Sequence, residues 1–256
     1  MKAAPEIRRV ALLADVHANR PALLAVLEAI DALEVDRVIC AGDLVGYNAE
    51  PNECIHLLRA HVHACIAGNH DRGVTEEIKE AGTNATAREV IEWTRGQLDP
   101  EALQYLRDLP AKHADASGVL LAHGCFLNDI FYRGYVTSTM VPRNLEAIRT
   151  RPEWPKVGAC GHTHVPMFAY AHRDQVFEAN GKEPIHWPAD AQSVLLNPGS
   201  VGQPRDGDPR ASFATIDMLE GRACIHRVPY DIQASASAIR DAGLPDTLSA
   251  RLYEGR

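Results

Sequence analysis

Apolar runs alternate with amphipathic stretches along the first 70 residues. Runs typical of buried strands occupy residues 9–14, 37–41 and 62–67. Between them, residues 21–33 predict a helix with Pro21 in position for a first turn. One helical stripe would carry Leu23, Leu24, Leu27 and Ile30. Residues 51–60 also read as a helix. This strand–helix–strand–helix–strand order predicts a parallel sheet with helices packed on it.

The pattern changes in the middle of the chain. Residues 72–112 lack strand periodicity and predict two helices, over 86–95 and 100–109. Strand patterns return over residues 119–122, 157–160, 168–170 and 194–196. A closing hairpin is expected over 213–217 and 223–228, around Glu220-Gly221, and a further helix over 137–149. We therefore expect one α/β domain over residues 1–256, with a helical insertion around 72–112.

Composition and charge narrow the classes of protein. With 256 residues, 46% of them hydrophobic and 23% charged, the chain has ordinary globular usage and is neither disordered nor fibrous. Its net charge of −8 argues against long nucleic acids as partners, because these need a basic surface. A small anionic substrate stays compatible, since a local cation can reverse the field inside one pocket.

The sequence gives no sign of a membrane or export signal. No stretch approaches the roughly 18 consecutive apolar residues of a membrane span, and the start lacks the pattern of a signal peptide. The six cysteines form no CxxC pair and no compact framework. We therefore expect a cytoplasmic protein with reduced thiols.

Polar residues with metal-binding side chains follow five of the predicted strands. They form the segments DVH at 15–17, GD at 42–43, GNHD at 68–71, HG at 123–124 and GHTH at 161–164. In open α/β sheets ligands collect beyond the carboxyl ends of the strands, so we expect these side chains on one rim. Each segment alone is as compatible with a turn or a structural polar cluster. Their ordered occurrence after five strands favours a site.

The chemistry of these side chains points to metal ions. Imidazole and carboxylate groups are ligands for divalent transition metals. The Asp-x-His and His-x-His spacings place two side chains on the same side of an extended segment. Seven candidate ligands are too many for one tetrahedral ion and suit two ions about 3.5–4 Å apart, as used for in-line displacement at phosphorus.

The segments DVH, AGD, GNHD, LLAHG and GHTH, in this order, resemble the five sequence blocks of the calcineurin-like metallophosphoesterases. The resemblance spans about residues 8–202. The following NPGSVG at 197–202, with Arg205-Asp206-Gly207, further resembles the compact bacterial and archaeal branch of YfcE-type phosphodiesterases. The resemblance implies a four-layer α/β/β/α sandwich, in which two stacked mixed sheets are flanked by helices.

The resemblance also implies roles for individual residues. It implies two groups of metal ligands and a bridging carboxylate: Asp15, His17 and His164; Asn69, His123 and His162; and Asp43 as the bridge. Asn69 and His70 would contact the substrate, and His70 would assist the leaving group without binding metal. Asp71 would orient His70, as carboxylates commonly fix an imidazole. The cofactors would be two divalent transition-metal ions, manganese first, with iron, nickel and zinc also suited to these ligands.

One block departs from a branch of the superfamily. The protein serine/threonine phosphatases carry GDxxDRG in the second block, whereas this chain has GDLVGYN at 42–48. Gly46-Tyr47 therefore replaces an Asp-Arg pair, which removes one arginine that holds phosphate and counts against a protein phosphatase. Whether Arg205 or Arg72 takes over that role stays open. The sequence also leaves open whether Arg205 and Asp206 reach the site or only form a turn. The same holds for Tyr47 and Asn48, which would either line the pocket or only form a loop.

We expect an enzyme that hydrolyses phosphodiester, small phosphoanhydride or phosphomonoester bonds by attack of metal-bound hydroxide. The alternatives are a catalytically silent metal-binding scaffold and, among enzymes, a protein or phosphomonoester phosphatase. The complete ligand set and the non-ligand His70 favour the enzyme. Its partner would be a small phosphate-ester substrate, without a membrane or a long nucleic acid. The oligomeric state, the substrate and the native metal stay open.

Overall fold

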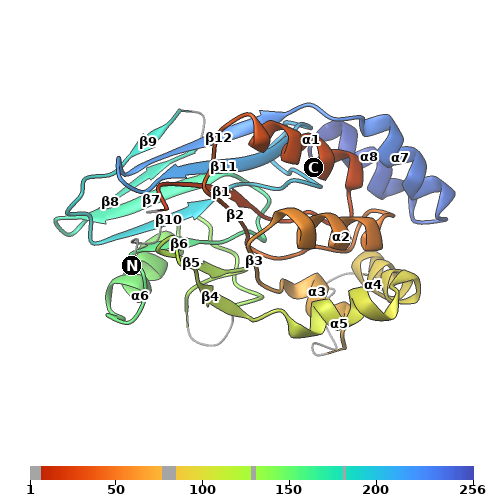
Figure 1. Ribbon diagram of the computed structural model, residues 1–256, viewed down its shortest axis with the longest axis horizontal. Coiled ribbons are helices and arrows are strands. Elements are labelled where there is room, and N and C mark those ends of the chain that lie inside the picture. The colour runs from red at the N-terminus through yellow and green to blue at the C-terminus, as the bar shows by residue number, and fades with distance from the viewer. Residues whose placement is uncertain (1–6, 77–84, 128–130, 181–182) are drawn as a thin grey trace, which may run out of the picture.

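Two stacked six-stranded sheets form the centre of the molecule, and helices cover both outer faces (Figure 1). The computed structural model describes residues 7–76, 85–127, 131–180 and 183–256. The predicted four-layer α/β/β/α sandwich of two mixed sheets is confirmed.

The first sheet contains the three N-terminal strands in parallel. Its order is β3 (Ala64–Cys65), β2 (Arg37–Cys40), β1 (Arg9–Leu13), β11 (Ala211–Asp217), β12 (Arg222–Val228) and β9 (Ile185–His186). Strands β1, β2 and β3 are parallel, as predicted, but β11 pairs antiparallel with β1 and makes the sheet mixed. Strands β11 and β12 form the predicted hairpin.

The second sheet brings the remaining predicted strands together. Its order is β4 (Lys112–Ala114), β5 (Val119–Ala122), β6 (Val157–Ala159), β10 (Ser193–Asn197), β7 (Met167–His172) and β8 (Gln175–Ala179). Strands β5, β6 and β10 are parallel, whereas β4, β7 and β8 pair antiparallel with their neighbours. Because β5 and β6 are parallel, their carboxyl ends lie at the same end of this sheet.

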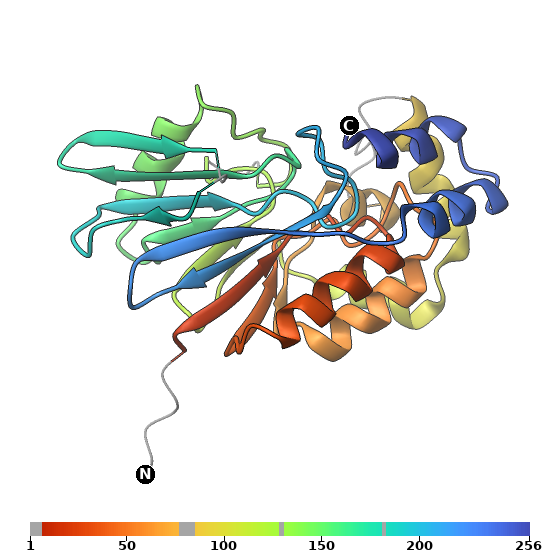
Figure 2. The ribbon, with the colours of Figure 1, turned by 90° about the horizontal axis from the view of Figure 1, so that it is seen from above.

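Alternation along β1 shows how the layers pack. Val10 and Leu12 belong to the apolar layer between the two sheets, and Ala11 and Leu13 belong to the layer under the helices. The helices α1 (Arg20–Asp31), α2 (Pro51–His61) and α5 (Pro100–Asp108) cover the first sheet. Helix α6 (Val141–Arg149) covers the second sheet on the opposite side (Figure 2).

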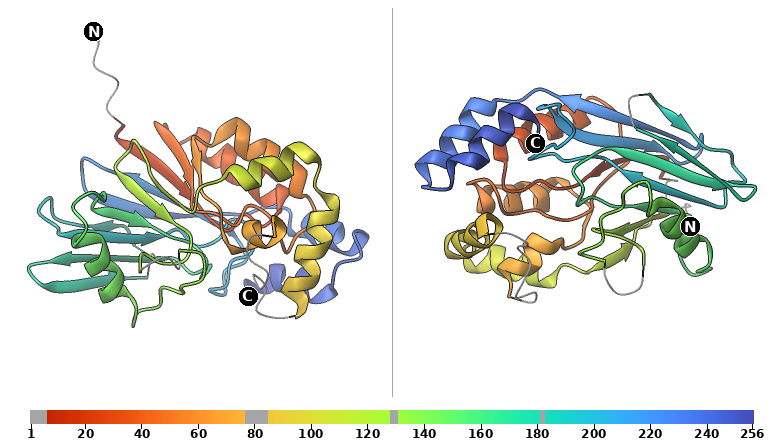
Figure 3. Two further views of the ribbon diagram at one scale, coloured as in Figure 1. Left: turned by 90° about the horizontal axis from the view of Figure 1, so that it is seen from below. Right: turned by 180° about the vertical axis from the view of Figure 1, so that it is seen from behind.

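A further group of helices lies at one end of the sheets (Figure 3). It contains α4 (Ala85–Gln97), α7 (Ile232–Asp241) and α8 (Asp246–Glu254), which share an apolar cluster with Tyr47. The short helix α3 (Asn69–Val74) contacts α4 and α5. Helices α4 and α5 confirm the two helices predicted over 86–95 and 100–109. Part of the helical insertion expected around 72–112, residues 77–84, lies outside the described residues.

Several elements differ from the sequence prediction. The helix expected over 137–149 begins only at Val141, where Pro142 occupies the first turn. The strand expected over 62–67 shortens to β3. Six elements were not predicted: α3, β4, β8, β9, α7 and α8. Across the described ranges, no helix has both the length and the apolar character needed to cross a membrane.

Candidate metal centre

The five polar segments meet where the two sheets face each other. Asp15 and His17 follow β1, Asp43 follows β2, and the GNHD segment follows β3, all in the first sheet. His123 follows β5, and the GHTH segment follows β6, both in the second sheet. The expectation of a single sheet rim is therefore corrected, because the side chains come from the adjoining edges of two sheets.

All seven candidate ligands are buried, and most have unusual backbone geometry. Left-handed backbone, with φ between 49° and 67°, occurs at Asp15, His17, Asp43, His162 and His164. For residues other than glycine this conformation is uncommon, and such outliers gather at functional sites. Sharp turns after β1, β2 and β6 thus aim these side chains inward.

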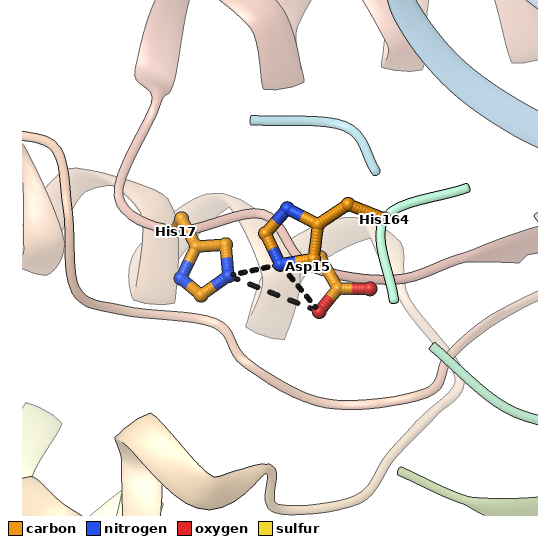
Figure 4. Close-up of side chains that lie close together, drawn as sticks. All are labelled: Asp15, His17 and His164. Carbon is orange, nitrogen blue, oxygen red and sulfur yellow. Dashed lines mark hydrogen bonds and ion pairs between the residues drawn. The ribbon is translucent and has the colours of Figure 1, made fainter. Parts of the chain in front are cut away.

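Asp15, His17 and His164 point toward one another (Figure 4). The two histidine Nε2 atoms lie 3.1 Å apart, and Asp15 Oδ1 lies 3.3 Å from Nε2 of His164. Each Nδ1 faces a backbone carbonyl, that of Val45 for His17 at 3.1 Å and that of Gln203 for His164 at 2.5 Å.

These contacts fit a bound cation. When Nδ1 donates its proton to a carbonyl, Nε2 of a neutral histidine carries a lone pair. Two such lone pairs then face each other at 3.1 Å and repel unless a positive ion lies nearby. The first candidate group therefore fits a metal ion.

Asp43, His123 and His162 form a second group of mutually close ligand atoms. His123 Nδ1 donates to the carbonyl of Ala41 at 2.8 Å, which aims Nε2 into the site. That Nε2 lies 3.2 Å from Oδ1 of Asn69 and 3.2 Å from Oδ2 of Asp43. The predicted second set of ligands is thus brought together.

Asp43 lies between the two groups. Its Oδ1 accepts a hydrogen bond from the His70 backbone N–H at 2.8 Å. Its Oδ2 lies 3.6 Å from Nε2 of His17 and 3.2 Å from Nε2 of His123. This is the position that a bridging carboxylate needs. Metal coordination by the seven residues stays a prediction, and their imidazole, carboxylate and amide groups suit divalent transition metals.

Burial keeps most of the histidines neutral. It lowers the pKa of His17 and His164 well below the usual value, and it lowers that of His162 to about 3. Burial alone would raise the pKa of Asp43, but His123 and His70 hold it well below the usual range. Burial raises the pKa of Asp15 to about 7, against the influence of His123. Neutral imidazoles beside an ionised Asp43 are what metal binding requires.

We expect metal binding to tighten as the pH rises from about 6 to about 9. Burial alone would lower the pKa of His123, yet the Asp43 carboxylate raises it to about 9. His123 must lose its proton before Nε2 can bind metal, so protons compete below that pH. Titration calorimetry in buffers of different ionisation enthalpy would measure both the affinity and the protons released. An affinity independent of pH over this range would contradict the role of His123.

His70 stands beside both groups without belonging to the predicted ligands. Its ring lies 4.9 Å from that of His17 and 4.4 Å from that of Tyr47. Its side chain is buried, and its Nδ1 has no hydrogen-bond partner among the described residues. A Cβ on residue 46 would overlap with this Nδ1, which explains why glycine stands there. His70 thus has a free ring nitrogen next to the candidate centre.

The expected role of Asp71 is corrected. Asp71 Oδ1 accepts from the backbone N–H groups of Leu44 and Val45, at 3.0 and 3.2 Å, and Oδ2 accepts from that of Gly68 at 2.8 Å. In the described structure its carboxylate makes no hydrogen bond to His70. The reason is that GNHD begins helix α3, so Asp71 bonds back to the residue preceding the helix. Asp71 holds the loop that carries Asp43.

Asp71→Asn should lower the free energy of unfolding by about 1–3 kcal/mol, the cost of unsatisfied buried groups. An asparagine NH2 would face a backbone N–H where the carboxylate now accepts. Chemical denaturation measures the loss. The matched control is Asp99→Asn, because Asp99 caps α5 through one bond to Ala102 N, which asparagine can keep. If Asp71→Asn instead lost far more activity on esters with poor leaving groups than on esters with good ones, Asp71 would act by orienting His70, as the sequence suggested.

The structure separates the two arginines that the sequence left open as phosphate ligands, and it shows one residue that sequence reasoning missed. Arg205 reaches the site, with its Cζ 5.5 Å from the ring centre of Tyr47, which in turn lines the centre. Arg72 is instead committed to the carbonyl of Leu109 and to Tyr132. Tyr135, which carries no motif, stacks on His162 with ring centres 4.1 Å apart.

Comparisons with known proteins agree with the geometry. The family model of the calcineurin-like phosphoesterase superfamily domain matches residues 9–221. The uncharacterized protein MJ0912 of Methanocaldococcus jannaschii is 32% identical over 254 residues, covering 96% of this chain and 98% of its own.

Two crystal structures are similar over nearly the whole chain. A metallophosphoesterase from Sphaerobacter thermophilus has 34% identity and a TM-score of 0.81, covering 97% of this chain and 99% of its own. The hypothetical protein PH1004 of Pyrococcus horikoshii, at 22% identity and a TM-score of 0.78, covers 97% and 98% and shares the fold. The chain belongs to the calcineurin-like phosphoesterase superfamily.

Proposed function

We propose that this chain is a phosphoesterase that uses two divalent metal ions to hydrolyse small phosphate esters, with phosphodiesters preferred. The observation that carries the proposal is the position of Asp43 between two groups of buried ligands. A structural zinc site would be closed and mostly rich in cysteine. Here the groups consist of histidines and carboxylates in a paired arrangement, which suits hydrolysis at phosphorus.

The first ion would be held by Asp15, His17 and His164, the second by Asn69, His123 and His162, and both by Asp43. When bound, such ions lower the pKa of a water molecule and offset the charge on phosphoryl oxygens. We propose manganese first, with iron, nickel and zinc as further candidates for the same ligands.

The residues of the chain have distinct tasks in this scheme. The carbonyls of Val45, Gln203 and Ala41 fix three histidine rings, so that Nε2 of each faces the centre. In its protonated form His70 can deliver a proton to the leaving oxygen and return to the neutral imidazole. Burial lowers the pKa of His70, so the ring is neutral in the metal-free protein and must take up a proton before it can act as the acid.

A groove that reaches the GHTH segment at Thr163 is the place that we propose for the second substituent of a diester. It has a volume of about 720 Å³, and its lining includes Thr163, which lies between His162 and His164 in the sequence. Val136 and Met167 line it as well, and Glu178 adds a negative charge. None of the seven candidate ligands is among its lining residues, so the groove would hold a part of the substrate away from the reacting phosphorus. The net charge of −8 keeps long nucleic acids out of the proposal.

One observation favours a second candidate, a phosphomonoesterase. Arg205 places a positive charge beside the centre, where it can help to hold the extra negative charge of a monoester. The two candidates share the metal chemistry and differ in substrate preference.

The deciding experiment combines metal reconstitution with a substrate screen. The chain is stripped with a chelator and reloaded with manganese, iron, nickel or zinc, and kcat/KM is measured for an aryl diester, an aryl monoester and a phosphoserine peptide. We expect no turnover without metal, recovery as two equivalents bind by elemental analysis, and the highest kcat/KM for the diester. Preference for the phosphopeptide would indicate a protein phosphatase. Metal binding without turnover of any ester would indicate a scaffold.

A further inference from the structure

The loop over residues 203–206 is held to the candidate metal centre by hydrogen bonds to both the side chain and the backbone of His164. The Gln203 carbonyl bonds to Nδ1 of His164 at 2.5 Å, and the Arg205 backbone N–H donates to the His164 carbonyl at 3.2 Å. Asp206 is tied to Arg227 of β12 by an ion pair. The position of Arg205 is therefore fixed by the same residue that is predicted to bind metal.

The Arg205 guanidinium rests on the aromatic wall of the centre. Its Cζ lies 5.5 Å from the ring centre of Tyr47, and one terminal nitrogen donates to Oε1 of Gln203 at 3.1 Å. Tyr47 also contacts the rings of His17 and His70, with ring centres at 4.6 and 4.4 Å. The side chain is thus stacked beside the two ligand groups rather than directed to bulk water.

Two hydrogen-bond donors of this loop lack an acceptor. Arg205 Nε and Gln203 Nε2 are buried and have no hydrogen-bond partner in the part of the chain that the structure describes. Gln203 as a whole is only 1% exposed. Buried donors are almost always paired in folded proteins, and leaving one unpaired is costly. Two adjacent unpaired donors indicate an acceptor that is supplied by a ligand.

The charge of Arg205 reaches the whole centre. Its guanidinium lies against the ring of Tyr47, and that ring contacts the rings of His17, His70 and His164. A positive field over these side chains favours an anion bound among them. Phosphoryl oxygens supply both the negative charge and the acceptors.

We propose that Arg205 and Gln203 form an anion subsite that binds a non-reacting phosphoryl oxygen of the substrate, with Tyr47 as the platform for the guanidinium. Gly46-Tyr47 stands where the protein phosphatases have an Asp-Arg pair, so their phosphate-binding arginine is missing at that position. In this subsite Arg205, from a different part of the chain, supplies the positive charge instead. It rests on the proposed phosphoesterase function and assigns the residues that hold the phosphate.

Inorganic phosphate serves as the probe, measured by titration calorimetry on the manganese-loaded chain. Arg205→Gln should bind phosphate about 10- to 100-fold more weakly, the effect of losing hydrogen bonds to a charged group. Arg205→Lys keeps the charge without the planar fork and should fall in between. The matched control is Arg240→Gln, which removes the same charge from the exposed end of α7 and should bind phosphate like the wild type. Elemental analysis should give unchanged metal content in all variants.

The outcomes separate the subsite from the proposed function. If Arg205→Gln binds phosphate as tightly as the wild type, or if the wild type binds none, the subsite is wrong. If metal leaves Arg205→Gln, the residue supports the metal centre and the subsite is also wrong. If phosphate binding depends on Arg205 but no phosphate ester is hydrolysed, the subsite holds and the proposed function fails. In an active enzyme, Arg205→Gln should raise KM more for a dianionic aryl monoester than for a monoanionic diester.

Discussion

Asp43→Asn is expected to release more than one metal equivalent per chain and to lower kcat/KM by more than about 100-fold. This loss exceeds the roughly 10- to 100-fold loss that follows when a residue that only supports a metal ligand is replaced. The carboxylate lies within 3.6 Å of His17 Nε2 and 3.2 Å of His123 Nε2. An asparagine keeps one acceptor oxygen, but its NH2 has no lone pair for a second ion. Both candidate groups therefore lose a shared ligand and a negative charge.

The matched comparison is Asp15→Asn, because Asp15 belongs to the first group of ligands and not to the second. It should release close to one equivalent where Asp43→Asn releases more. Elemental analysis after dialysis gives the count, and circular dichroism shows whether each variant is folded. Loss of a single ion with activity retained in Asp43→Asn would exclude the bridging role.

The sequence predicted the layered fold well because its signals are local. Apolar runs in β1, β2, β5 and β6 mark strands buried on both faces, and such runs are read without knowledge of the partner strand. The polar segments that follow them identified the centre for the same reason, since each lies directly after its strand. Which strands share a sheet depends on pairing between distant segments, which the sequence does not show. The expectation that all five segments lie on the rim of one sheet was wrong for this reason.

The elements that escaped prediction depend on tertiary contacts. Helix α7 contains three alanines and two serines among its ten residues, so its buried side, which contacts α1 and α8, is formed mainly by small side chains. Strand β8 is mostly exposed along its length and lies at a sheet edge, so it lacks a buried face. Both elements pack mainly on the adjacent elements of the chain, α7 on α8 and β8 on β7, and the pattern of a single segment does not show such packing.

For the functional residues too, a motif can identify a residue, but its contacts depend on the fold. Asp71 was recognised from its motif, yet its partners are the backbone amides of another loop, which side-chain spacing does not reveal. Arg205 lies 158 positions after Tyr47 and contacts it only because the loop over 203–206 is bound to His164. Tyr135 stacks on His162 from a segment without regular structure. Each of these roles requires the fold before it can be assigned.

His70→Ala is expected to keep both metal ions and to lose about 10²- to 10⁴-fold in turnover, the range for a general acid or base. The metal site should survive because His70 supports Asp43 through its backbone N–H, at 2.8 Å from Oδ1, which alanine retains. What disappears is a buried ring with an unpartnered Nδ1 beside both ligand groups. That ring is the group that we propose as the proton donor to the leaving oxygen.

Leaving-group dependence separates this role from others. A good leaving group such as nitrophenolate departs without a proton, whereas an alkoxide needs one, so His70→Ala should lose far more activity on alkyl esters than on nitrophenyl esters. His61→Ala, at the exposed end of α2, is the control and should behave like the wild type. Equal losses on both esters would make His70 a group that only positions the phosphate. Departure of one metal equivalent would make it a ligand, because its ring also lies within reach of His17 and Asp43.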